Sequence, residues 1–241
     1  MRPRALLFVF GTQPWSTLLL IAAAGTLLGG LVESLAILPS FCGGTASLVG
    51  ALGLDGALRL TFDINPPGSL LSSWVLMLIG MMSPLVAEPI QHVYWSSLPT
   101  RRLRAISFFC SAYIGIWTLA GIVLTVAAML IRLAFSGNLF PVFFTVVLAL
   151  FWSSTPFRQV GLNRCHRVRS VGLFGWKADR DAMEYGFSSG VWCVASCWAW
   201  MLVPLVMHVG HLAAMLVVSA ILLVERLKAT RKPAWRIPAI N

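Results

Sequence analysis

Long apolar runs separated by short polar segments dominate the chain and predict a bundle of membrane-spanning helices. A helix needs roughly 20 apolar residues to cross about 30 Å of hydrocarbon. Six runs approach or exceed that length, namely 15–38, 70–92, 105–134, 139–157, 184–206 and 209–226. The fourth and sixth are slightly short. We therefore expect an all-α fold, a polytopic membrane bundle of six transmembrane helices.

The polar segments between these runs divide what we expect to be a single transmembrane domain, residues 1–241. Residues 39–69 form a Gly-rich outer loop, 158–183 a basic cytoplasmic loop and 227–241 a basic cytoplasmic tail. The N-terminal MRPR leads into the first run without a small-residue cleavage site, which is typical of a retained anchor.

Composition and charge support the same class of protein. The chain is 58% hydrophobic and only 11% charged, whereas soluble domains carry roughly a quarter of their residues as charges. Of the 18 lysines and arginines, only Arg59 and Arg132 lie on one predicted side. This asymmetry places both termini in the cytoplasm and suits a multi-pass protein of a bacterial inner membrane. The net charge of +10 then sets orientation and attracts anionic lipid, and no nucleic-acid partner is implied.

The fifth run contains a ladder of sulfur atoms in the stretch GVWCVASCWAWM (190–201). Cys193, Cys197 and Met201 recur every fourth residue and therefore share one helical face. Thiolate and thioether sulfurs are soft ligands that favour Cu(I). Buried cysteine is also a common packing residue, so the ladder alone does not separate a metal site from packing.

The second run offers a matching stripe of Met77, Met81, Glu88 and His92. An ionisable side chain within a span is costly in lipid and marks an interior or functional position, although Glu88 near the inner end could also snorkel. From 1.5 Å per residue, Met77 and Met81 lie roughly 10–17 Å below the outer edge, and the two cysteines roughly 13–20 Å. A Cys/Met site is predicted if these two helices are neighbours.

Two further groups could bind metal near the membrane surfaces. His208 and His211 lie between the fifth and sixth runs and could capture metal at the outer face, although single histidines at a helix end are often plain interfacial residues. Cys165 and His166 lie in the basic inner loop and could exchange metal with the cytoplasm, or the pair could be incidental. Motifs of hydrolases and nucleotide-binding enzymes are absent from the sequence, which argues against an enzyme of those classes.

Several stretches resemble a family of bacterial predicted metal-binding integral membrane proteins, an uncharacterised-domain family sometimes labelled copper chaperones. They are WVLMLIGMMSP (74–84), YIGIW (113–117), FRQVGLNRCHR (157–167), GFSSGVWCVASCWAWM (186–201) and LLVERL (222–227). The resemblance implies a cysteine followed by a Cys-Cys-Trp cluster, and here Ser196 stands at the first position of that cluster. It also implies two loop cysteines, of which Gly161 replaces the first and Cys165 is the second.

Three functions are compatible with these patterns. The first is binding and delivery of Cu(I) through Cys and Met ligands, with a metal-receiving protein as partner. The second is a subunit of a membrane oxidoreductase or oxygenase, in which His92, His208 and Glu88 would ligate copper, iron or haem. The third is a structural or assembly subunit of a larger membrane complex, with no metal, because the many small residues also suit close helix packing.

Overall fold

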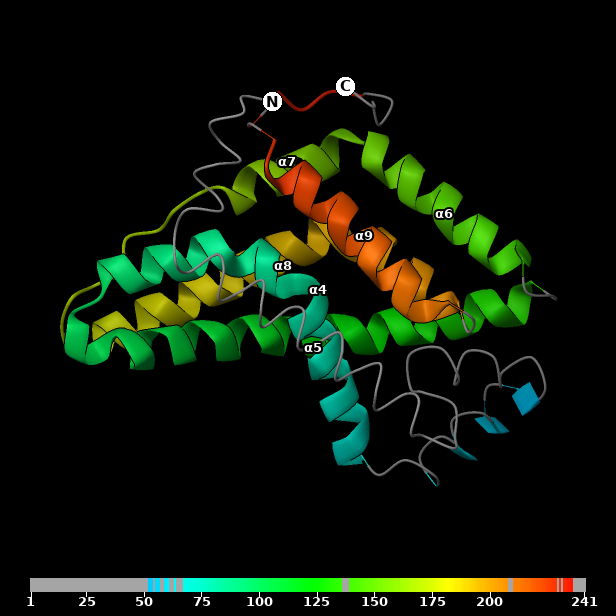
Figure 1. The fold of residues 1–241 in the computed structure, drawn as a ribbon, viewed down its shortest axis with the longest axis horizontal. Helices are drawn as coiled ribbons and strands as arrows, with labels where there is room; N and C mark the ends of the chain where they lie inside the picture. Colours follow the sequence, from blue (N-terminus) through cyan, green and yellow to red (C-terminus); the bar gives the residue numbers. More distant parts are fainter. Residues whose placement is uncertain are drawn as a thin grey trace.

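The computed structural model describes residues 67–135, 139–207 and 210–228, with scattered positions between 52 and 63 and between 230 and 235. The regular structure in this part of the chain is helical (Figure 1), which confirms the all-α prediction. The elements are α4 (Pro67–Ser96), the 3-10 helix η1 (Pro99–Arg101), α5 (Arg102–Ala134), α6 (Leu139–Ser154), α7 (Pro156–Cys165), α8 (Gly175–Val206) and α9 (His211–Arg226). The predicted span 15–38 lies outside the described residues.

Three of the described helical stretches are long and apolar enough to cross a membrane: Trp74–Ser96, Pro99–Ala134 and Gly175–Val206. Helices α6 and α7 would add a fourth span if they act as one, although they are bent by 73° at their junction. Helix α9 has 16 residues, which is short for a complete crossing. The six-span topology therefore stays a prediction.

Helix α8 is the centre of the bundle and packs against α5, α6, α7 and α9. Its longest contact is with α5, and Figure 1 shows the two helices running side by side. Glycines make this close approach possible. A Cβ atom on Gly186 would lie 2.3 Å from the carbonyl oxygen of Phe109, and one on Gly190 would lie 3.0 Å from the Cβ of Ile116. Small residues are the usual means by which membrane helices pack closely.

Helices extend into the segment that the sequence predicts as the inner loop. Helix α7 begins directly after α6 because Thr155 caps it, accepting a hydrogen bond from the backbone N–H of Arg158, and because Pro156 suits the first helical turn. Helix α8 begins at Gly175, nine residues before the predicted fifth span at 184. Only the short segment between His166 and Phe174 connects α7 to α8.

The early start of α8 is explained by ion pairs that its charged first turns make with the beginning of α5. Asp179 is buried, and its carboxylate accepts hydrogen bonds from Arg101 at 3.0 Å and from Arg104 at 2.8 Å. A buried carboxylate is tolerated when it is paired and hydrogen-bonded in this way. The apolar run alone therefore underestimates the length of the helix.

Helix α4 packs chiefly against α5 and α9. It contains Pro84 and Pro89, which remove backbone donors, and Figure 1 shows the helix changing direction partway along its length. The Ser219 hydroxyl of α9 donates to the carbonyl oxygen of Met81 at 3.2 Å. Contact between α4 and α8 is made by His92 and Tyr185, whose rings meet edge to face with centroids 5.8 Å apart.

Candidate metal centre

The two cysteines of the sulfur ladder lie together inside the bundle. Cys193 and Cys197 occupy one face of α8 and expose only 5% and 2% of their surfaces. Their side chains lie one helical turn apart, near enough to interact with each other. The four-residue spacing predicts a shared face, and the structure shows in addition that this face is turned into the core. Two soft donors are thus available side by side.

Hydroxyl groups surround this pair of thiols. The Tyr113 hydroxyl of α5 donates to the sulfur of Cys193 at 3.2 Å. The hydroxyl of Ser196 lies 3.4 Å from the sulfur of Cys197 and donates to the carbonyl oxygen of Cys193 at 2.9 Å. A hydrogen bond donated to sulfur stabilises it when it carries negative charge. The surroundings therefore suit thiolates better than a purely apolar core would.

A third cysteine reaches the pair from α7. Cys165, at the end of that helix, exposes 6% of its surface. Its thiol lies beside the hydroxyl of Ser196 and near Cys193 and Cys197. A Cβ atom on Gly161, one turn earlier, would lie 3.4 Å from the Cβ of Ser196. Helix α7 thus lies on the side of α8 that carries the cysteines.

The sequence predicts Cys165 only as part of an exposed Cys-His pair that could exchange metal with the cytoplasm, and not as a neighbour of the α8 thiols. A signal was nonetheless present: the resemblance of residues 157–167 to a family pattern in which this position is a cysteine. The residues that bury it, Arg158 and Arg226, are charged themselves and do not register as core in a hydropathy pattern.

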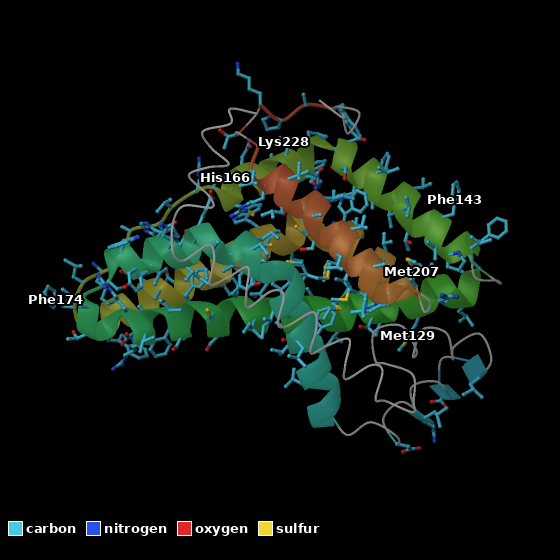
Figure 2. All side chains as sticks on the ribbon, viewed as in Figure 1. Met129, Phe143, His166, Phe174, Met207 and Lys228 are labelled. Carbon is cyan, nitrogen blue, oxygen red and sulfur yellow. The ribbon has the colours of Figure 1, made fainter. Side chains whose placement is uncertain are left out.

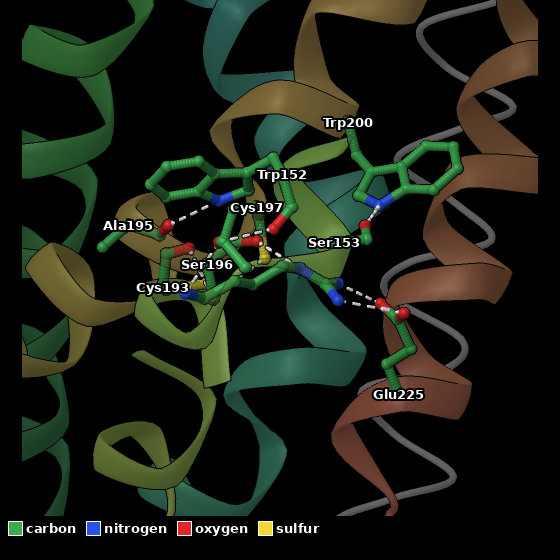
Figure 3. A network of polar contacts seen from close by, with 10 residues as sticks. Trp152, Ser153, Cys193, Ala195, Ser196, Cys197, Trp200 and Glu225 are labelled. Carbon is green, nitrogen blue, oxygen red and sulfur yellow. Dashed lines mark hydrogen bonds and ion pairs between the residues drawn. The ribbon is translucent and has the colours of Figure 1, made fainter. Parts of the chain in front are cut away.

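Two buried arginines lie beside the three thiols. Arg158 donates through Nε to the carbonyl oxygen of Ser196 at 3.0 Å and pairs with both carboxylate oxygens of Glu225 (Figure 3). Arg226 donates to the carbonyl oxygen of Cys165 at 2.8 Å, and its guanidinium also contacts the thiol of that residue. Positive charge is therefore held next to the sulfur atoms inside the core.

The tryptophans interleaved with the cysteines attach α6 to α8. Trp198 meets Trp152 edge to face at 5.1 Å between ring centroids, and Trp152 donates to the carbonyl oxygen of Ala195 at 3.1 Å. The indole of Trp200 donates to the hydroxyl of Ser153 at 3.0 Å. Figure 3 shows the hydrogen bonds of Trp152 to Ala195 and of Trp200 to Ser153 on either side of the cysteines. The aromatic residues of the motif thus enclose the thiols.

The predicted methionine ligands share the same apolar core. Met201 lies one turn beyond Cys197 on α8 and is fully buried, as is Met81 on α4, while Met77 exposes 5%. All three belong to the cluster of buried side chains that contains the cysteines. Because α4 packs chiefly on α5 and α9, direct contact of Met77 and Met81 with the thiols stays a prediction.

The structure joins Glu88 and His92 to the segment after α7. The carboxylate of Glu88 lies 3.6 Å from Nδ1 of His166. The Nε2 of His92 is hydrogen-bonded to the carbonyl oxygen of Arg169 at 2.8 Å, so it acts there as the donor. These contacts fasten the inner end of α4 to residues 166–169. Figure 2 shows His166 in the upper part of the molecule, near Lys228.

At the opposite end of α8, His211 is buried and bonds through Nδ1 to the carbonyl oxygen of Pro204 at 2.7 Å. The imidazole ring of His211 thus satisfies a backbone carbonyl near the C-terminal end of α8. Met215, one turn further along α9, is also buried. His208, the other predicted outer ligand, lies outside the described residues. The outer capture site stays a prediction.

Within the described residues, no three side chains among His, Cys, Asp and Glu already form a group that could hold a metal ion. The soft donors nevertheless fit one metal well. Cu(I) accepts low coordination numbers and prefers sulfur, and the thiol pair, the adjacent methionine and the nearby third thiol supply sulfur only.

Comparison with known proteins adds an independent observation. A family model described as PpoB2, copper chaperone, matches residues 71–241. The matched range includes all the described helices of the site, from α5 to α9, and nearly all of α4. No curated protein and no solved structure matches the chain.

Proposed function

The chain belongs to the PpoB2 copper chaperone family, and on that premise we propose that it binds Cu(I) inside the membrane and delivers it to a receiving protein. The ligands would be the thiolates of Cys193 and Cys197 with the thioether of Met201. The observation that carries this proposal is the burial of two thiols one turn apart on the same face of α8, which offers two soft donors in one place.

The charge of the site supports copper in its reduced form. A bare cation in the core would be very costly, whereas two thiolates more than neutralise Cu(I) and the excess negative charge faces Arg158 and Arg226. Each thiol that binds metal must lose its proton. The hydroxyl of Tyr113, which donates to Cys193 at 3.2 Å, stabilises the resulting thiolate.

Additional ligands would allow copper to move from the outer face of the bundle to the thiols of α8. We propose that Met77 and Met81 supply further thioethers from α4, and that His208 and His211 capture metal at the outer face. The burial of Met77 and Met81 in the core that holds the cysteines supports the first of these roles. The position of His211 at the outer end of α8 supports the second.

The surface of α5 supports residence in a membrane. Leu119, Ile122, Val123 and Leu130 expose half or more of their surfaces along this helix. An apolar face of this size on a helix long enough to span is typical of contact with lipid. We propose the bacterial inner membrane, with both termini in the cytoplasm, because of the charge asymmetry between the two sides.

The test is to measure copper in protein purified after expression with added copper under reducing conditions. The unmodified protein is expected to hold Cu(I), which is colourless, and the double variant Cys193→Ser/Cys197→Ser to lose it. Cys110→Ser is the matched control, since Cys110 is a half-buried cysteine on α5 with no contact to the other thiols among its interactions.

Unchanged copper content in the double variant would overturn the site. A Soret band in the optical spectrum would instead indicate haem and favour the oxidoreductase function. Copper loss in Cys110→Ser as well would mean that the cysteine substitutions act through misfolding.

A further inference from the structure

The thiol of Cys165 lies near the cysteine pair of α8 and next to the hydroxyl of Ser196. That hydroxyl contacts both Cys165 and Cys197. Ser196 therefore stands at the junction between α7 and the cysteine-bearing face of α8. Rotation of the Ser196 and Cys165 side chains within their rotamers is the movement that would bring a third sulfur to a metal bound at the pair.

Arg226 provides a second and independent sign that negative charge is expected at this position. It exposes 8% of its surface, and its Nε atom is buried without a hydrogen-bond partner. Among the described residues, no carboxylate lies within ion-pair distance of it, whereas Arg158 is paired with Glu225. The carboxylate of Glu88 acts on Arg226 electrostatically but makes no close ion pair with it. Burying a guanidinium is costly unless it is well paired, so a thiolate at Cys165 would offset part of that cost.

We propose that Cys165 is the third sulfur ligand of the Cu(I) site, that Arg226 is the counter-charge of its thiolate, and that copper leaves the α8 pair through Cys165 on the cytoplasmic side. This inference rests on the proposed function. Cu(I) neutralises one thiolate only, so a site of three thiolates is negative overall, and the guanidinium of Arg226 beside Cys165 compensates part of that charge.

The transfer step involves no change of oxidation state. The Cys165 thiol releases its proton to solvent as its sulfur bonds to Cu(I), and the metal is then held by three sulfurs. One bond to Cys193 or Cys197 breaks, and the released thiolate takes up a proton. Protons and charge therefore balance without an oxidant or a reductant.

The position of Cys165 in the fold explains the direction of transfer. It is the last residue of α7, and the chain that follows it is exposed from Arg167 to Ser170. Cys193 and Cys197 lie within a helix that is covered on several sides. Of the three thiols, Cys165 is thus the one next to a surface segment that a receiving protein could contact.

X-ray absorption at the copper edge tests the proposal. In a Met77→Leu/Met81→Leu/Met201→Leu background, which removes the thioethers proposed as ligands, Cu(I) is expected to have three sulfur neighbours. Adding Cys165→Ser is expected to reduce that number to two and to weaken Cu(I) affinity about tenfold in a chelator competition. Adding Cys110→Ser instead is expected to change neither value.

Arg226 gives a second measurement that does not depend on removing a thiol. Arg226→Gln is expected to weaken Cu(I) affinity and Arg226→Lys to retain most of it, because lysine keeps the charge. If Cys193→Ser/Cys197→Ser abolishes copper binding but Cys165→Ser leaves sulfur number and affinity unchanged, this inference fails while the proposed function stands. If the double variant still binds copper, the proposed function itself fails.

Discussion

Ser196 occupies a position where a change of one atom has a large chemical effect. Its hydroxyl contacts Cys165 and Cys197 and donates to the backbone of Cys193. Oxygen of a neutral hydroxyl is a poor ligand for Cu(I), whereas sulfur at the same place would be a good one. The serine therefore limits how many soft donors surround the site.

We predict that Ser196→Cys raises Cu(I) affinity by about tenfold or more, equal to about 1.4 kcal/mol, because it adds a thiolate between two existing ones. Competition with a Cu(I) chelator measures the change. Ser188→Cys, about two turns earlier on α8 and half-buried, is the control and should leave the affinity unchanged. An equal gain in both variants would show non-specific binding by the added thiol.

At the scale of helices, the close approach of α5 and α8 determines where the site residues lie. Tyr113 of α5 reaches Cys193 only because glycines allow the two backbones to come together. A Cβ atom on Gly186 would be 2.3 Å from a backbone oxygen, which cannot rotate away as a side chain could. Nothing lies within 4 Å of the equivalent point on Gly115.

Gly186→Ala is accordingly expected to destabilise the protein by about 1–3 kcal/mol through overpacking. Gly115→Ala in α5 should be neutral or slightly stabilising, since alanine favours a helix over glycine by roughly 0.5–1 kcal/mol. Thermal unfolding in detergent compares the two. If Gly115→Ala destabilised as much as Gly186→Ala, the contact between the helices would not be the cause.

The helices that the sequence predicts well are those whose burial is apolar. The runs at 70–92 and 105–134 each fall within one described helix, and α9 (His211–Arg226) covers most of the run 209–226. Continuous hydrophobic residues suit a span whatever their neighbours are. Helix α7 could not be found in this way. Its burial depends on the ion pair of Arg158 with Glu225, which lies more than sixty residues away. An ion pair between distant residues produces no periodic pattern of hydrophobic positions in the sequence.

The candidate site shows the same division. The common face of Cys193 and Cys197 follows from helical spacing, and their burial follows from the apolar run around them. Which helix lies opposite is a property of packing. Depth suggested α4, whereas the structure brings α7 with Cys165 to this face, and the break at Pro156 that permits it is visible in sequence only as a proline.

For the whole molecule, the sidedness of the membrane decides whether delivery is inward. Trp176 lies before the charged turns of α8 and exposes 72% of its surface, while Leu139 at the start of α6 exposes 84%. From the charge asymmetry we predict that the first lies on the cytoplasmic side and the second outside.

We predict that an impermeant maleimide labels Leu139→Cys in right-side-out spheroplasts and labels Trp176→Cys only after lysis. Both variants are made with Cys42→Ser, because Cys42 is expected outside. Labelling of Trp176→Cys in intact spheroplasts would reverse the orientation and with it the direction of copper delivery.

The ion pair of Arg158 with Glu225 has a mechanical consequence. Arg158 of α7 donates a hydrogen bond to the backbone of α8 at Ser196 and forms an ion pair with Glu225 of α9. One side chain therefore links three helices around the thiols. Breaking such a buried pair is expensive, and large rocking motions between these helices are therefore disfavoured. Copper would then pass from one sulfur to the next by rotation of side chains within a nearly rigid bundle, and not by a movement of whole helices.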